Sequence, residues 1–477
     1  MELKSDTKIS MSTPWGFRIR SSTSFIIFAV CIGLFTDSIT ASSIIPILPS
    51  ALVTRAGVPE EHVQFYISAF MTSFSITFIA AAPIFGHLSD RLTSRRRPFV
   101  WGMIVNILSL LLYMKATSVI GMAIARALQG VSSSAILVIG TALVKDSVTK
   151  EKTGKGMAFT TVAIQLGLIM GPAFGGLIYD NVGYEAVFIA PAFLLAMDIV
   201  LRLLIIETPV ARLWLLHHKS DSLNGNTEDG GETEPLIDPS RNTSVRDTSS
   251  TQIVSSNGKT IMDLLPVLRF FLNGRIVTAL FISLLDSISW GALESTVPFF
   301  VIRTFHWTPT NAGTLFLISC TPGILLTYVV GRSIDRLGSL YLATPGLSVV
   351  AACHLSQRLV HSNTLRDKVM LTTFFTTGNA AMLFVQIAMS VEVGLAAQQI
   401  DDSLKGQGGR MVGKAYALYM MVQSFGQLLG PVIGGAMMET VGWAGMTTLL
   451  GALCLVALPC VLLFTGGGVA AWRSKAS

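Results

Sequence analysis

The chain has 477 residues, of which 51% are hydrophobic and only 13% are charged, with a formal net charge of +6. Soluble domains are about one quarter charged, so this composition excludes a soluble globular enzyme and a disordered chain. The apolar runs are continuous over about 20 residues, which predicts membrane-spanning helices and excludes a β-barrel.

Twelve apolar segments are long enough to cross a bilayer. In chain order they lie at 24–48, 63–86, 98–115, 119–144, 157–178 and 185–206, and then at 275–300, 311–331, 340–360, 369–396, 414–437 and 443–465. The ninth is the weakest, because His354, Gln357 and Arg358 dilute it. The expected fold is all-α and integral to the membrane, with twelve transmembrane helices in two pseudo-symmetric six-helix halves.

A polar stretch rich in Ser, Asn, Thr, Asp, Glu and Gly separates the two halves. It is too polar to bury a core and is predicted to be a flexible linker. The expected organisation is an N-terminal tail (1–22), a first six-helix half (23–206), the linker (207–262), a second six-helix half (263–465) and a C-terminal tail (466–477).

Lysine and arginine gather in the two tails and in alternate loops. Such loops face the cytosol in multi-pass proteins, so both termini and the linker are expected there. The plasma membrane is the expected location, with a vacuolar or vesicular membrane as the alternative. The most basic loops carry Arg91, Arg95, Arg96 and Arg97 after the second segment, and Lys145, Lys150, Lys152 and Lys155 after the fourth.

The fifth and eleventh segments share the pattern G-x-x-x-G-P-x-x-G-G. Glycines four residues apart lie on one helical face and allow close packing, while proline bends the helix. The motif therefore either packs a tight helix pair or also belongs to a transport mechanism. It comprises Gly167, Gly171, Pro172, Gly175 and Gly176 in the first half, and Gly426, Gly430, Pro431, Gly434 and Gly435 in the second.

A second pair of motifs follows the second and eighth segments, in predicted loops. A carboxylate at a helix end can meet the positive N-terminus of a facing helix or a nearby arginine. The alternative is a solvated charge pair, but its repetition in both halves favours a shared role. The motifs are GHLSDRL, with Gly86, Asp90 and Arg91, and GRSIDRL, with Gly331, Asp335 and Arg336. Two repeated halves are typical of transporters that rock around a solute site at the midplane.

These motifs resemble the major facilitator superfamily over nearly the whole chain, and look most like its twelve-span drug:proton antiporters, including the vesicular amine transporter branch. GHLSDRL resembles the family's loop 2/3 signature, although Thr93-Ser94 replace the expected glycine. ARALQG, at 125–130, resembles the helix 4 signature with its intramembrane arginine. GLIMGPAFGG resembles the antiporter signature of helix 5. The resemblance implies alternating access, with Asp90 helping to close the cytosolic side and Asp335 mirroring it.

Ionisable residues inside apolar segments are the main candidates for proton coupling or substrate binding. A charge at membrane depth costs at least about 2.5–3.5 kcal/mol and usually marks a pathway or relay. The candidates are Asp37, Arg126, Glu294 and Glu392. The contexts of the three acids resemble acidic positions of vesicular amine transporters, whose further acid in helix 11 is replaced here by Tyr419 and Met420. Each acid could instead be a satisfied packing carboxylate, and Glu392 could approach the cytosolic end.

Two other acidic residues leave alternatives open. Asp286 could face the same cavity as Glu294 or cap the cytosolic end of its helix. Asp198 and Arg202 are spaced i,i+4, which favours an ion pair that snorkels toward the membrane surface. Polar and aromatic residues on the inner helices could line a substrate cavity or join helices to one another. These are Gln129, Ser133, Gln165, Trp290, Asn379, Gln423 and Gln427.

The expected function is a proton-coupled antiporter that exports or sequesters an organic cationic or amphipathic compound, such as a drug, toxin or secondary metabolite. Protonation and substrate binding would then compete for one carboxyl in a dry cavity. The alternatives are a proton symporter or facilitator that imports a nutrient and, less favoured, a non-transporting sensor. No nucleotide-binding loop is visible, so the expectation is a transporter and not an enzyme.

The expected partners are the small-molecule substrate, protons and the bilayer, with no nucleic acid and with a monomeric chain. No cofactor or metal is expected, and the five cysteines lie in apolar stretches as core residues. In the linker, Glu232, Leu236 and Ile237 resemble an acidic di-leucine sorting signal for adaptors, although such a short pattern also arises by chance.

Overall fold

The structure is a computed structural model that describes residues 17–91, 95–148, 153–205, 268–403 and 410–465. The predicted linker, the C-terminal tail, most of the N-terminal tail and the sorting pattern at Glu232 lie outside these ranges.

Long helices account for nearly all of the described chain. In the first half, α1 (Phe17–Arg20) precedes α2 (Thr23–Ser42), which continues through η1 (Ile45–Ile47) into α3 (Leu48–Ala56). After η2 (Glu60–His62) come α4 (Val63–Arg91), α5 (Arg96–Lys115), α6 (Val119–Ser147), α7 (Thr153–Val182) and α8 (Ala186–Leu204).

The second half repeats this plan. A short α11 (Leu268–Phe271) precedes α12 (Gly274–Phe305), α13 (Pro309–Leu337), α14 (Ser339–Gln357), α15 (Leu365–Ser403), α16 (Arg410–Thr440) and α17 (Gly442–Phe464). Within the described ranges, eleven helical stretches are long and apolar enough to span a membrane. The remaining predicted segment, the eleventh at 414–437, lies in α16, which has 31 residues. The predicted fold class is confirmed.

The two repeated acidic motifs were predicted to lie in loops, but they lie inside helices. Gly86, Asp90 and Arg91 belong to the last turns of α4, and Asp335 and Arg336 to those of α13. The apolar segments ended earlier because hydropathy detects the part of a helix that lipid covers, whereas the backbone hydrogen bonds continue into polar sequence. Helix α13 ends only at Leu337, where the next residue, Gly338, has a positive φ of 88° that glycine adopts readily.

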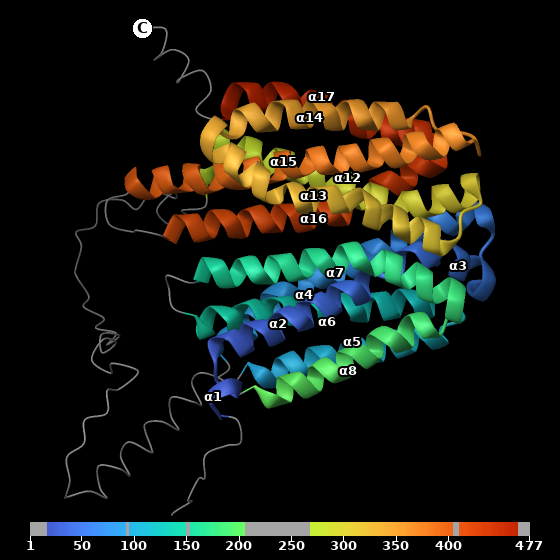
Figure 1. Cartoon of the computed structure of the whole chain (residues 1–477), viewed down its shortest axis with the longest axis horizontal. Helices are drawn as coiled ribbons and strands as arrows, with labels where there is room; N and C mark the ends of the chain where they lie inside the picture. Colours follow the sequence, from blue (N-terminus) through green and yellow to red (C-terminus); the bar gives the residue numbers. More distant parts are fainter. Residues whose placement is uncertain (1–16, 92–94, 149–152, 206–267, 404–409, 466–477) are drawn as a thin grey trace, which may run out of the picture.

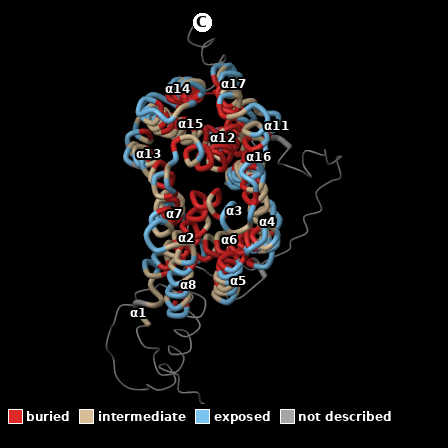
Figure 2. The backbone as a smooth tube through the Cα atoms, turned by 90° about the vertical axis from the view of Figure 1, so that its right-hand side faces the viewer, coloured by how far each residue is buried: buried red, intermediate tan, exposed pale blue. Residues whose placement is uncertain are grey.

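The helices run side by side in two bundles (Figure 1). Seen along the helices, the second half lies above the first, with buried residues gathered inside each half (Figure 2). We call the end where α8 finishes and α11 begins the linker end, and the opposite end the far end. One apolar core lies almost entirely in the first half and two more lie in the second.

The G-x-x-x-G-P-x-x-G-G motif brings α7 against α2 and α16 against α12. A Cβ on Gly167 would lie 2.5 Å from the carbonyl oxygen of Phe35, and one on Gly175 would lie 1.8 Å from that of Ser43. In α16, a Cβ on Gly430 would lie 2.6 Å from the carbonyl oxygen of Ile288. Only glycine allows these backbones to approach so closely. Pro172 and Pro431 lie inside the two motif helices.

The same motif helices take part in the contact between the halves, at the far end. A Cβ on Gly176 would lie 2.2 Å from the carbonyl oxygen of Pro309, so α7 meets the start of α13. Two hydrogen bonds join the halves here. The Thr310 amide donates to Asp180 Oδ2 at 2.9 Å, and Gln64 Nε2 donates to the carbonyl oxygen of Ser295 at 3.3 Å. The structure is therefore closed at the far end.

We expect Gly175→Ala to destabilise the protein by about 1–3 kcal/mol, because the added methyl must displace the α2 backbone. The measurement is the apparent Tm of the purified protein in detergent. The control is Gly413→Ala, at a helical glycine with nothing within 4 Å of an added Cβ. That variant should keep its stability or gain up to about 1 kcal/mol. Equal Tm values for both variants would contradict the close contact.

Candidate functional site

Asp37 is a buried carboxylate shared by three helices of the first half. It lies on α2, and its Oδ1 accepts hydrogen bonds from Asn106 Nδ2 of α5 at 2.8 Å and from Ser133 Oγ of α6 at 2.9 Å. Neighbouring hydroxyls on α2 are satisfied locally, since Ser38 and Thr40 donate to carbonyl oxygens one turn earlier. The carboxylate therefore has neutral partners, and no described arginine or lysine forms an ion pair with it.

Arg126 lies beside the same stretch of α2 and is only 1% exposed. Its Nη1 donates to the carbonyl oxygen of Ala41 at 3.0 Å and to Gln129 Oε1 at 2.9 Å. Gln129 Nε2 in turn donates to the carbonyl oxygen of Thr40 at 3.3 Å. The Nε and Nη2 atoms of Arg126 are buried without a hydrogen-bond acceptor among the described residues. Unsatisfied donors of this kind are costly, so the guanidinium is ready to bind an added acceptor.

Glu294 extends the site into the second half. It is half-buried on α12, and its charge interacts with that of Arg126 across the boundary between the halves, without a direct ion pair. Trp290, one turn earlier, presents its ring edge-on to Phe316 at a centroid distance of 6.3 Å. The structure therefore gathers Asp37, Arg126, Gln129 and, from the other half, Glu294 into one polar region.

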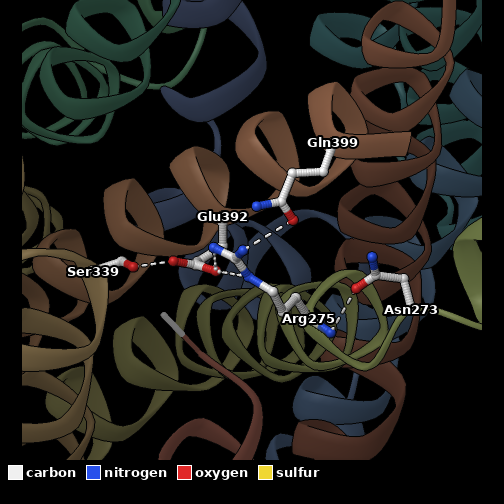
Figure 3. A network of polar contacts seen from close by, with 5 residues as sticks. All are labelled: Asn273, Arg275, Ser339, Glu392 and Gln399. Atoms are coloured by element: carbon white, nitrogen blue, oxygen red, sulfur yellow. Dashed lines mark hydrogen bonds and ion pairs between the residues drawn. The ribbon is translucent and has the colours of Figure 1, made fainter. Parts of the chain in front are cut away.

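Glu392 does not join this group. It is 1% exposed and contacts Arg275, near the start of α12 (Figure 3). Arg275, the second residue of α12, donates from Nε and Nη2 to Glu392 Oε2, both at 2.8 Å. The Ser339 hydroxyl of α14 donates to Oε1, and Arg275 Nη1 also donates to Gln399 Oε1 at 3.2 Å. These contacts make Glu392 an anchor that ties α12, α14 and α15 together.

The other predicted cavity residues are scattered. Gln165 is exposed on α7, while Asn379 on α15 and Gln423 on α16 are half-buried. Asn379 Nδ2 is buried and lacks an acceptor among the described residues. The structure does not gather these three with Asp37.

For most of the side chains of the repeated acidic motifs the structure gives no contacts. The side chains of Asp90, Arg91 and Asp335 lie outside the described part, and Arg336 is exposed. Gly86 and Gly331 have nothing within 4 Å of an added Cβ. The proposed gating role of these motifs stays a prediction.

The prediction that Asp198 and Arg202 snorkel is wrong. Their exposed fractions are 2% and 0%, because both side chains of α8 turn inward against α2 and α5. Arg202 Nη2 donates to the carbonyl oxygen of Ala29 at 3.0 Å, and the guanidinium stacks over Phe99 at 3.8 Å. Gly33 leaves room for this pair, since a Cβ there would lie 2.6 Å from Asp198 Oδ2.

Asn106, Arg275 and Ser339 are partners of the candidate carboxylates that were not identified from the sequence. Asn106 is a lone amide in an apolar stretch, and that isolation is a usable signal for a buried hydrogen bond. Arg275 gave no such signal in the sequence, because it looks like an ordinary basic residue at a helix start. Within the described ranges, no three His, Cys, Asp or Glu side chains lie close enough to hold a metal ion.

We expect Arg275→Gln to lower stability by about 1–3 kcal/mol, because it leaves the Glu392 carboxylate buried without a counter-charge. The double variant Arg275→Gln/Glu392→Gln removes both charges and should recover part of this loss. Apparent Tm values of the two single variants and the double variant form the cycle. Additive losses would contradict the ion pair.

Comparisons with known proteins agree with this architecture. The sequence model of the Major Facilitator Superfamily matches residues 30–413. The MFS-type transporter ppzB of Metarhizium rileyi is 25% identical over 474 residues, covering 95% of this chain and 97% of the relative. The human chromaffin granule amine transporter is 22% identical, over 88% of this chain and 70% of the relative.

Solved structures show the same fold. A D-xylose-proton symporter matches with a TM-score of 0.65 and 15% identity, over 93% of this chain and 97% of its own. The nucleoside transporter NupG matches with a TM-score of 0.64 and 13% identity, over 92% and 98% of the two chains. The protein is therefore an integral multi-pass membrane transporter, not an enzyme, and it belongs to the Major Facilitator Superfamily.

Proposed function

We propose that the protein is a proton-coupled antiporter that moves an organic cation by alternating access. The observation that carries the proposal is Asp37, a buried carboxyl whose hydrogen-bond donors are the neutral side chains of Asn106 and Ser133. Such a carboxyl can be neutralised either by a proton or by a cationic substrate. Competition between the two is what couples their opposite movements.

The Arg126–Glu294 interaction supports coupling between the halves. Arg126 belongs to α6 of the first half and Glu294 to α12 of the second, so any motion of one half against the other changes their separation. When Glu294 binds a proton or a cation, it loses its attraction for Arg126. Substrate or proton binding can thereby bias the position of the halves. The similarity to an amine transporter supports a cationic substrate, although it is distant.

We further propose that the linker end faces the cytosol, as the basic loops predict. The contacts of Gly176, Thr310 and Gln64 close the far end, so in this conformation the side away from the cytosol is the closed one. Transport to the other side requires these contacts to separate. The plasma membrane is the proposed location.

The test of coupling uses proteoliposomes with an acidic lumen and the probe 1-methyl-4-phenylpyridinium, a permanently charged aromatic cation. The wild type should accumulate the cation and alkalinise the lumen. Asp37→Asn should lower the initial rate at least about tenfold, because the variant loses the group for which proton and cation compete. Uptake by the wild type that ignores the pH gradient would reject antiport, and accumulation only when the lumen is the alkaline side would favour a symporter.

The test of alternating access links the halves at the far end. In Asp180→Cys/Thr310→Cys, oxidation should form a disulfide, because the Asp180 carboxylate already contacts the Thr310 amide. The bond should stop transport, and a reducing agent should restore it. Each single variant is the control under oxidation. Full transport by the cross-linked protein would contradict the separation of this end.

A further inference from the structure

The second half carries an aspartate in the same position as Asp37. The sequence around Asp37 reads Asp37-Ser38-Ile39, and α12 contains Asp286-Ser287-Ile288. A three-residue match does not by itself make the two aspartates equivalent. The packing of the glycine motifs supplies an independent test of whether the two aspartates are equivalent.

The contacts of Gly167 and Gly426 set the register between the halves. A Cβ on Gly167 would lie 2.5 Å from the carbonyl oxygen of Phe35 and 2.6 Å from Ser38 Cβ. A Cβ on Gly426 would lie 2.8 Å from the carbonyl oxygen of Leu284 and 2.5 Å from Ser287 Cβ. In each half the aspartate stands between the two contacted residues.

The next glycine of each motif gives the same register. A Cβ on Gly171 would lie 3.0 Å from the carbonyl oxygen of Ile39, and one on Gly430 would lie 2.6 Å from that of Ile288. Asp37 and Asp286 are therefore structural counterparts at the same depth of α2 and α12.

The surroundings of Asp286 are again neutral. Gln386 Nε2 of α15 donates to Asp286 Oδ2 at 3.3 Å, and the Tyr419 hydroxyl of α16 donates to the carbonyl oxygen of Gln386 at 3.5 Å. Among the described residues, the titratable groups on packed helices that the Asp286 charge affects are Tyr419 and, on α17, Cys454, both of them neutral at pH 7. No described arginine or lysine pairs with it, in contrast to Glu392. A lone carboxylate at this depth is costly when charged, so a proton is its natural partner.

We propose that Asp286 binds a second coupling proton. Each half of the transporter then carries its own protonatable carboxyl at the same place in its first membrane-spanning helix, Asp37 in α2 and Asp286 in α12. This inference rests on the proposed antiport. Glu294 lies eight residues further along α12, about 12 Å toward the far end at the helical rise. Asp286 is thus the carboxyl of α12 nearer the linker end, so it exchanges its proton with that side in this conformation and with the other side once the halves have moved.

The test counts protons in the same proteoliposomes, with the membrane potential clamped at zero by valinomycin and equal potassium. Each proton exchanged for 1-methyl-4-phenylpyridinium then multiplies the equilibrium accumulation about tenfold per pH unit. The wild type should show about 100-fold per unit and Asp286→Asn about 10-fold. Asp286→Glu should restore the steeper slope. Glu439→Gln, at an exposed residue of α16, is the control and should match the wild type.

The outcomes separate this inference from the proposed function. An unchanged slope in Asp286→Asn, or a wild-type slope of about 10-fold, overturns the second proton while leaving antiport intact. A flat wild-type slope rejects antiport and the inference with it.

A second measurement does not depend on how well a variant folds. Dicyclohexylcarbodiimide modifies protonated carboxyls in apolar surroundings, and mass spectrometry of the wild type locates the adduct. We expect modification of Asp286 that decreases as the pH rises. Modification of Asp37 or Glu294 with none at Asp286 would overturn the proposal.

Discussion

The backbone contact made by the glycine motif determines much else in this structure. In each half it presses one helix directly against the backbone of another, α7 on α2 and α16 on α12. Because no side chain fits between them, the rotation and depth of α2 and α12 are fixed to within a fraction of a turn. The glycine contact and the carboxyl are therefore linked, since the residues that the motif touches flank Asp37 and Asp286.

A carboxyl can take part in transport only if its charge state can change. Here that depends on the side chains that neighbouring helices place beside it. Glu392 accepts hydrogen bonds from Nε and Nη2 of Arg275 and from the Ser339 hydroxyl, so its negative charge is balanced by a fixed cation. Asp37 receives an amide and a hydroxyl, which stabilise a carboxylate without balancing its charge. An acidic side chain at membrane depth is thus an anchor where a cation is built in beside it, as at Glu392, and on the proposed function it takes up a proton where none is, as at Asp37.

The fold was predictable from sequence because continuous apolar runs and a repeated motif are strong local signals. The helix ends around Asp90 and Asp335 were not, because hydropathy stops where lipid contact stops. Among the acids, Asp37, Glu294 and Glu392 look alike in sequence, each a lone charge in an apolar run. What distinguishes Glu392 is Arg275, which is 117 residues away along the chain. Asp286 carried a usable signal, the repeated Asp-Ser-Ile, but its register became clear only from the contacts of Gly426.

The two halves are alike in the backbone contacts of their glycine motifs and different in the polar partners of their equivalent aspartates. Asp37 accepts from two donors, and it lies one turn before Ala41, whose carbonyl oxygen Arg126 contacts. Asp286 has one amide donor, and the described titratable groups that its charge affects, Tyr419 and Cys454, are uncharged at neutral pH. Equivalent carboxyls in unequal surroundings release their protons under different conditions. On the proposed coupling, the two halves would therefore bind and release their protons in sequence instead of at once, and the Arg126–Glu294 interaction would couple the protonation of one half to the position of the other.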